Sequence, residues 1–128
     1  MLEIYIDAAS AGNPGPSGIG IFIKGEGHLL KISEPIGVTD NHHAEFQAFV
    51  HAMKEAEKLT PSIVSLRSDS KIVVASIEKR YAKKESYKEL LATGLAISDT
   101  FPLFFVQWIP DEQNKAADAL AREAIHKN

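Results

Sequence analysis

Four carboxylates stand out in this sequence because of where they fall. Asp7 lies late in a strand-forming segment, between Ile6 and a run of small residues, and Asp69 ends another such segment, in LRSDSK. Glu45 and Asp118 lie in the first turns of two segments with helical periodicity. Burial normally excludes a carboxylate that is neither paired nor bound to metal, and Asp7 has no local partner.

The chemistry that these carboxylates would support depends on whether they meet. Carboxylates crowded together repel and ionise jointly only if cations neutralise them. Ligation by oxygen alone suits Mg²⁺ or Mn²⁺, which are hard ions that commonly bind phosphate. The set therefore indicates metal-assisted phosphoryl transfer. Simpler roles remain open for three members: Glu45 could complement a helix N-terminus, Asp69 could cap the helix that follows it, and Asp118 could pair with Arg122 four residues on.

The predicted elements place these residues at one edge of a sheet. Strands are expected over 2–9, 18–24, 28–34, 62–68 and the segment PLFFVQW, and helices over 41–59, SKIVVASIEKR, 85–99 and NKAADALAREAIHK. The order β-β-β-α-β-α-α-β-α predicts an α/β fold, a mixed sheet flanked by helices, in one domain spanning 1–128. The first and fourth strands should be parallel neighbours, so their C-terminal ends would place Asp7 beside Asp69.

Composition narrows the setting. The chain has 128 residues, 45% of them hydrophobic, and no cysteine, which excludes disulfides and thiolate metal sites. No apolar run could span a bilayer, and we expect a cytoplasmic monomer. A net charge of −3 argues against a nucleic-acid binder that relies on a strong positive field. One basic patch, KRYAKKESYK from Lys79 to Lys88, is most simply a solvated helix end and loop.

Four segments together resemble a known family. DAASAGNPGPSGIGI, DNHHAEFQA, LRSDSKIVV and WIPDEQNKAADALAREA are similar to the four successive motifs of type 1 ribonuclease H, in order and over essentially the whole chain. The resemblance is to a short form that lacks the basic handle and the loop histidine of some members. It implies a ribonuclease H-like fold with a five-stranded mixed sheet and a metal site made by Asp7, Glu45, Asp69 and Asp118.

The resemblance also implies an activity. Family members are endonucleases that hydrolyse the RNA strand of RNA/DNA hybrids and leave 5′-phosphate and 3′-hydroxyl ends. By resemblance, Asp7 would bridge two Mg²⁺ or Mn²⁺ ions, Glu45 and Asp69 would help hold the ion that activates water, and Asp118 would hold the ion beside the leaving oxygen. Substrate contacts would come from the backbone at Ala8, from residues facing the minor groove, and from residues beside Asp69, that is from Ala8, Asn13, Asn41, His42, Ser70 and Lys71.

Three departures from the family pattern bear on activity. Ala8 stands where many members carry glycine, the loop IPDEQNK has no histidine, and the basic handle is missing or reduced to the basic patch. These leave an alternative open, namely a catalytically silent nucleic-acid-binding or protein-interaction module. A 3′-exonuclease or a transposase-like domain is disfavoured by the short chain and the NKAADALA motif.

Two further features carry expectations that the structure can test. Gly12, Gly15 and Gly18, with two prolines between them, are expected to form a rigid turn that nucleic acid can approach closely. The aromatic residues of PLFFVQW, which are Phe104, Phe105 and Trp108, are expected in the strand core. No two of the histidines show metal-ligand spacing.

Overall fold

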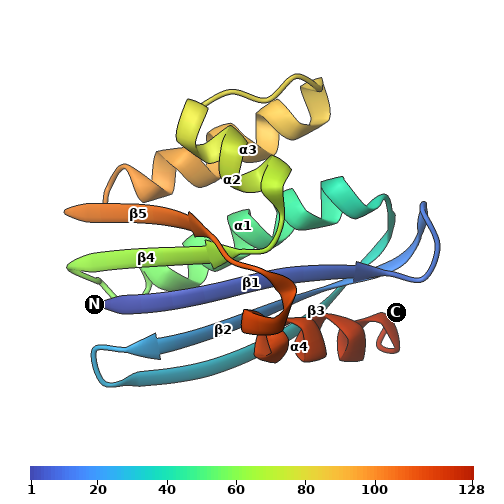
Figure 1. Ribbon diagram of the computed structural model, residues 1–128, viewed down its shortest axis with the longest axis horizontal. Helices are drawn as coiled ribbons and strands as arrows, with labels where there is room; N and C mark the ends of the chain where they lie inside the picture. The colour runs from blue at the N-terminus through green and yellow to red at the C-terminus, as the bar shows by residue number, and fades with distance from the viewer.

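A mixed sheet of five strands forms the centre of the computed structural model, which describes residues 1–128 (Figure 1). The strands are β1 (Leu2–Ser10), β2 (Gly15–Gly25), β3 (His28–Thr39), β4 (Ile63–Ser68) and β5 (Leu103–Trp108), and their order in the sheet is β3-β2-β1-β4-β5. The first three strands are antiparallel neighbours, whereas β4 runs parallel to β1 and β5 runs parallel to β4. The predicted parallel pairing of the first and fourth strands is confirmed.

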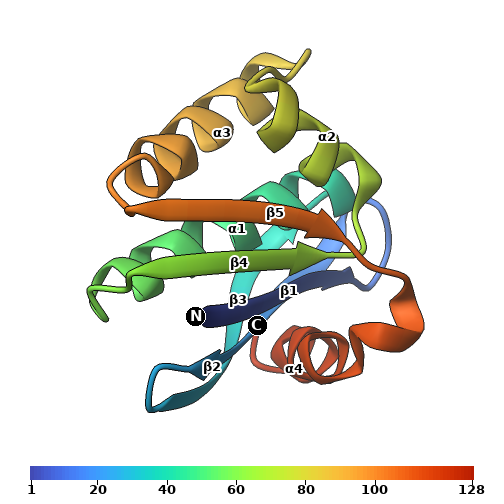
Figure 2. The same cartoon turned by 60° about the vertical axis from the view of Figure 1, so that its left-hand side comes forward.

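Helices cover both faces of this sheet. The helices are α1 (Asn41–Glu57), α2 (Lys71–Lys79), α3 (Glu85–Ser98) and α4 (Lys115–Ile125), with a short 3₁₀ helix, η1 (Asp111–Gln113), before α4. Figures 1 and 2 show α1, α2 and α3 on one side of the sheet and α4 on the other. The predicted element order and fold class are confirmed, and none of the helices is long and apolar enough to cross a membrane.

Side chains along β1 and β2 alternate between the two faces of the sheet, and one face carries the apolar residues of the core. Ile4 and Ile6 of β1 and Ile19 and Ile21 of β2 are fully buried against the apolar stripe of α1, which includes Phe49. The strands β2 and β3 extend further than predicted, because antiparallel pairing continues to Gly15 opposite Thr39. Pro35 is tolerated in β3 because this strand is an edge of the sheet, where a missing N–H costs no ladder bond.

On the opposite face of β2, Gly18 and Gly20 have no side chains, which lets α4 approach closely. A β-carbon added to Gly18 would lie 2.5 Å from the Ala124 side chain, and one added to Gly20 would lie 2.1 Å from the Ala117 carbonyl oxygen. The prediction that three glycines form the turn is therefore wrong for Gly15 and Gly18, which lie within β2, and Gly18 makes room for α4. This packing fixes the helix that carries Asp118.

The aromatic prediction for β5 is only partly right. Phe104 is half-buried and packs on the core, but Phe105 is 55% exposed and Trp108 is 42% exposed. Phe105 points to the face opposite Phe104, and α4 packs on β1, β2 and β3 and leaves that face of β5 uncovered, whereas Trp108 lies at the end of β5 beside Lys71 of α2.

Candidate active site

Asp7 lies near the C-terminal end of β1, beside the end of β4. The register pairs Ile6 with Ser68, so Asp7 and Asp69 follow neighbouring positions at the ends of parallel strands. One carboxylate oxygen of Asp7 accepts a hydrogen bond from the backbone N–H of Ala8 at 2.9 Å. Burial, with added repulsion from Asp69, raises the pKa of Asp7 to about 8. The site thus holds a carboxylate that lacks a compensating positive charge.

Asp69 is not the cap of α2. The N-cap is Ser70, whose hydroxyl accepts a hydrogen bond from the N–H of Val73 at 3.3 Å, so the capping alternative for Asp69 is wrong. The pKa of Asp69 is raised, mainly by burial and further by Asp111, while a hydrogen bond from Asn114 opposes the rise. The Asp69 carboxylate is therefore left available for a ligand.

Glu45 projects from the first turns of α1, whose N-cap is Asp40. The Asp40 carboxylate accepts from the N–H of His43 at 2.7 Å, which meets the need of this helix end without Glu45. Burial raises the pKa of Glu45, although a hydrogen bond with Ser70 and the nearby His42 oppose the rise. The His42 Nδ1 lies 3.8 Å from a Glu45 oxygen. Repulsion from Asp69 also reaches Glu45, which places it at the same edge of the sheet.

Asp118 lies in the first turn of α4, on the opposite side of the sheet from Glu45. The Nε of Arg122 donates to both of its carboxylate oxygens at 3.0 Å, so the predicted pairing four residues apart is confirmed. This pairing does not exclude a second role, because Asp118 also contributes to the raised pKa of Asp7.

A cavity of about 270 Å³ joins three of the four predicted carboxylates. Its lining residues are Asp7, Ala8, Asp69, Asp111, Asp118 and Arg122. Glu45 does not line this cavity and borders it through Asp69 and Ser70. Four acidic side chains and one basic side chain therefore face a single small space.

Sequence reasoning missed three residues of this region. Asp111 lies in η1, and an exposed acidic residue in such a short helix does not by itself indicate a site. The one sequence signal was its position between the last strand and the helix that carries Asp118. Arg122 was recognised as a partner of Asp118 but not as part of a cavity. Asn114 is buried, and its side-chain amide donates to the carbonyl of Ile6 at 2.8 Å, which ties the start of α4 to the end of β1.

The donor set fits a hard divalent cation. All acidic groups around the cavity offer oxygen ligands, and a bound cation would offset both the burial and the repulsion between acids that raise the pKa values of Asp7 and Asp69. No three histidine, aspartate or glutamate side chains already converge at ligand spacing. Asp7, Asp69 and Asp118 would hold the ion from the cavity and Glu45 from its border.

The predicted substrate residues fall in two groups around the site. Asn13 and Asn41 meet, because the side-chain oxygen of Asn13 accepts from the N–H of Asn41 at 3.0 Å, and the neighbouring His42 is exposed. Lys71 lies 5.3 Å from the ring centroid of Trp108, whose indole N–H donates to the carbonyl of Asp69 at 3.2 Å. The Ser70 hydroxyl accepts the capping hydrogen bond of α2 and also makes a hydrogen bond with Glu45.

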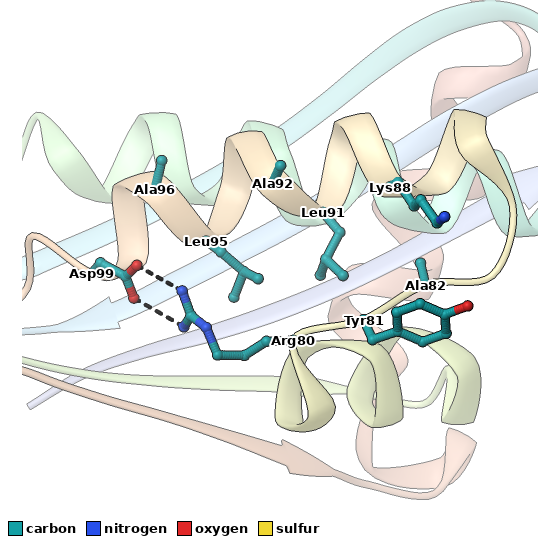
Figure 3. A pocket seen from close by; sticks show the side chains of 9 residues that line it. All are labelled: Arg80, Tyr81, Ala82, Lys88, Leu91, Ala92, Leu95, Ala96 and Asp99. Carbon is teal, nitrogen blue, oxygen red and sulfur yellow. Dashed lines mark hydrogen bonds and ion pairs between the residues drawn. The ribbon is translucent and has the colours of Figure 1, made fainter.

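The basic patch forms a separate surface at the junction of α2 and α3. Arg80 ends α2 in a left-handed conformation and makes two hydrogen bonds to Asp99, at 3.0 and 2.7 Å. Figure 3 shows this pair at one end of a hollow of about 550 Å³, with Leu91 and Leu95 in its floor and Tyr81 at the other end. This hollow is mostly apolar and lies away from the carboxylates.

Known proteins share this sequence pattern and fold. The family model described as "Reverse transcriptase-like" matches residues 6–124. EbsB of Enterococcus faecalis, whose name places it among candidate hydrolases, is 46% identical over 99% of this chain and 96% of its own length. A ribonuclease H of Bartonella tribocorum is 32% identical over 98% of this chain and 89% of its own length.

A solved structure agrees with these relatives. LC11-RNase H1 in complex with an RNA/DNA hybrid has a TM-score of 0.89 and 36% identity, covering 99% of this chain and 98% of that one. The fold is that of the ribonuclease H-like class, with its mixed five-stranded sheet and helices on both faces. The chain belongs to the ribonuclease H family. It spans only 35% of the length of three mycobacterial relatives, which are longer proteins.

Proposed function

We propose that this protein is a divalent-metal-dependent endonuclease that hydrolyses the RNA strand of RNA/DNA hybrids. The observation that carries the proposal is the cavity in which Asp7, Asp69 and Asp118 meet at the C-terminal edge of parallel strands. Additional support comes from LC11-RNase H1, a relative of 36% identity that was solved with a hybrid bound. We further propose that residues 1–128 act as one domain, as a monomer in the cytoplasm.

Each carboxylate would hold a metal ion according to its position in the site. When bound, two Mg²⁺ or Mn²⁺ ions supply the activation of water and the neutralisation of the leaving oxygen in an in-line displacement. Asp7, between the other groups at the sheet edge, would hold both ions. Glu45 and Asp69 would hold the ion on the water side, and Asp118 the ion on the leaving-group side. The products would carry 5′-phosphate and 3′-hydroxyl ends.

The polar residues around the carboxylates would select the substrate. Asn13 and Asn41 are linked by a hydrogen bond and stand at the exposed end of the site with His42, where 2′-hydroxyl groups of an RNA strand can be recognised. Lys71, held near the Trp108 ring, would meet backbone phosphate on the other side of Asp69. Ser70 would act through the cap that orients α2 and, with it, Lys71.

A second candidate is a module that binds hybrids without cutting them. Ala8 favours it, because this residue lines the cavity at a position where many family members have glycine. A methyl group there would hold the RNA strand away from the carboxylates. The substitution Ala8→Gly separates the two candidates: a large gain in cleavage shows that this methyl group restrains the enzyme, and unchanged cleavage rejects that explanation.

The deciding experiment is cleavage of a labelled RNA/DNA hybrid in Mg²⁺ and in Mn²⁺. Single-stranded RNA, double-stranded RNA and duplex DNA serve as competing substrates. We expect internal cuts in the RNA strand of the hybrid only, abolished by Asp7→Asn and by Asp69→Asn and retained by Glu89→Gln, which changes an exposed carboxylate of α3. A wild-type protein that binds hybrid but cuts no more than the two site variants would establish the binding module instead.

A further inference from the structure

Arg122 is the one basic side chain among the six residues that line the carboxylate cavity. Its Nε donates to both oxygens of Asp118 at 3.0 Å, and Asp118 and Asp7 both stabilise its positive charge, raising its pKa. Asp7, Asp69 and Asp111 have no basic partner of their own in the structure. The guanidinium is therefore the only positive charge that the chain itself places in this cluster of acids.

We propose that Arg122 acts as a built-in counter-cation that competes with divalent metal for Asp118 and thereby weakens metal binding to the free protein. The inference rests on the proposed function, because it assigns Asp118 to a metal ligand set. It adds a residue that sets the affinity of this site and that acts through Asp118 rather than on the substrate. Arg122 is thus a positioning residue and not a catalytic one.

The geometry sets two cations in competition for Asp118. The Nε of Arg122 contacts both carboxylate oxygens at 3.0 Å, and a metal ion bound to either oxygen would bring its charge against that of the guanidinium. The guanidinium can leave without disturbing the fold, because Arg122 is 73% exposed and lies one turn along the surface of α4. The exchange of one cation for another therefore needs only a side-chain rotation.

The size of the competition follows from exposure. Pairs four residues apart on an exposed helix are weak, and the contact with Asp118 is worth about a two- to threefold change in an equilibrium constant. Asp7 adds to the attraction that Asp118 exerts on the guanidinium of Arg122. We expect removal of the guanidinium to tighten divalent binding by about threefold to fivefold.

The test is calorimetric titration of the metal-free protein with Mn²⁺ and with Mg²⁺, so the measured quantity is affinity and not activity. We expect Arg122→Gln to bind tighter than wild type and Arg122→Lys to fall between them, because lysine keeps the charge without the geometry of the guanidinium. Lys115→Gln is the matched control, since it removes one positive charge from the same turn of α4 that contains Asp118 and makes no contact with it. The effect of Arg122→Gln should also vanish in an Asp118→Asn background.

Each outcome decides a separate point. Equal or weaker binding by Arg122→Gln than by wild type would overturn the inference and leave the proposed function standing. An equal gain in Lys115→Gln would overturn it as well, because general charge and not competition for Asp118 would then be the cause. If wild type bound neither ion, the proposed function itself would fail, and the inference with it.

Discussion

Replacing Asp7 with asparagine should stabilise the metal-free protein at neutral pH. Burial and Asp69 raise the pKa of Asp7 from 3.8 to about 8. Between these two values the native state holds a proton that the unfolded chain has released. Stability therefore falls as the pH rises from about 4 to about 8, and the loss is absent below that window. Asparagine removes the titration and still offers an oxygen to the N–H of Ala8.

The magnitude can be worked from the same shift. One pKa unit corresponds to about 1.4 kcal/mol, so a rise of about four units sets an upper limit of about 6 kcal/mol on the destabilisation at pH 8. Asp7 is only partly buried, and water at the mouth of the cavity screens its charge. We therefore expect Asp7→Asn to add about 2 kcal/mol at pH 7.5, which for a domain of this size raises Tm by about 8 °C.

The assay is thermal and urea unfolding in the presence of a chelator, from pH 4 to pH 8.5. Wild type should lose stability across this range more steeply than Asp7→Asn, and the two should converge near pH 4. Glu89→Gln serves as the control, because it neutralises an exposed carboxylate and should change stability by less than about 0.5 kcal/mol. Destabilisation by Asp7→Asn at pH 7.5 would refute the reasoning and would make Asp7 a structural residue.

Three further predictions follow from the same geometry. Mg²⁺ or Mn²⁺ at a hundredfold excess over Kd should increase the free energy of unfolding of wild type by about 2.7 kcal/mol and so raise its Tm. Calorimetry should show no such gain in Asp69→Asn. Gly20→Ala should cost about 2 kcal/mol or more in urea unfolding, because its β-carbon would lie 2.1 Å from a backbone oxygen of α4; an unchanged midpoint would mean that α4 can shift freely. Trp108→Phe should lower stability by about 1 kcal/mol in the same assay, since the hydrogen bond to the Asp69 carbonyl is lost, and no change would show that this bond is replaced by water.

Much of the fold and half of the site could be predicted from sequence because they depend on local patterns. The alternation of β1 and the helical stripe of α1 are visible in a single segment, and the order of elements makes β1 and β4 parallel neighbours. That one topological step brings Asp7 to Asp69. The roles of Ser70 and Asp40 as helix caps could equally have been seen in the sequence, since both precede a helix directly.

The remaining features depend on contacts between distant segments. Asn114 is one polar residue among several in its loop, and its bond to the carbonyl of Ile6 spans most of the chain. Phe105 reads as core in a hydrophobic strand, and only the position of α4 leaves its face of the sheet open. Asp111 enters the cavity because η1 turns the chain back toward β1, which no local periodicity predicts.

The packing of α4 on the bare face of β2 has a consequence for biosynthesis. The helix is made after every other element, and its first turn supplies Asp118 and the neighbouring Asn114 that ties it to β1. On the proposed function, a nascent chain on the ribosome cannot yet cut RNA, since the ligand set is completed only when α4 has left the exit tunnel and docked over Gly18 and Gly20. Onset of activity would then depend on the synthesis and docking of α4.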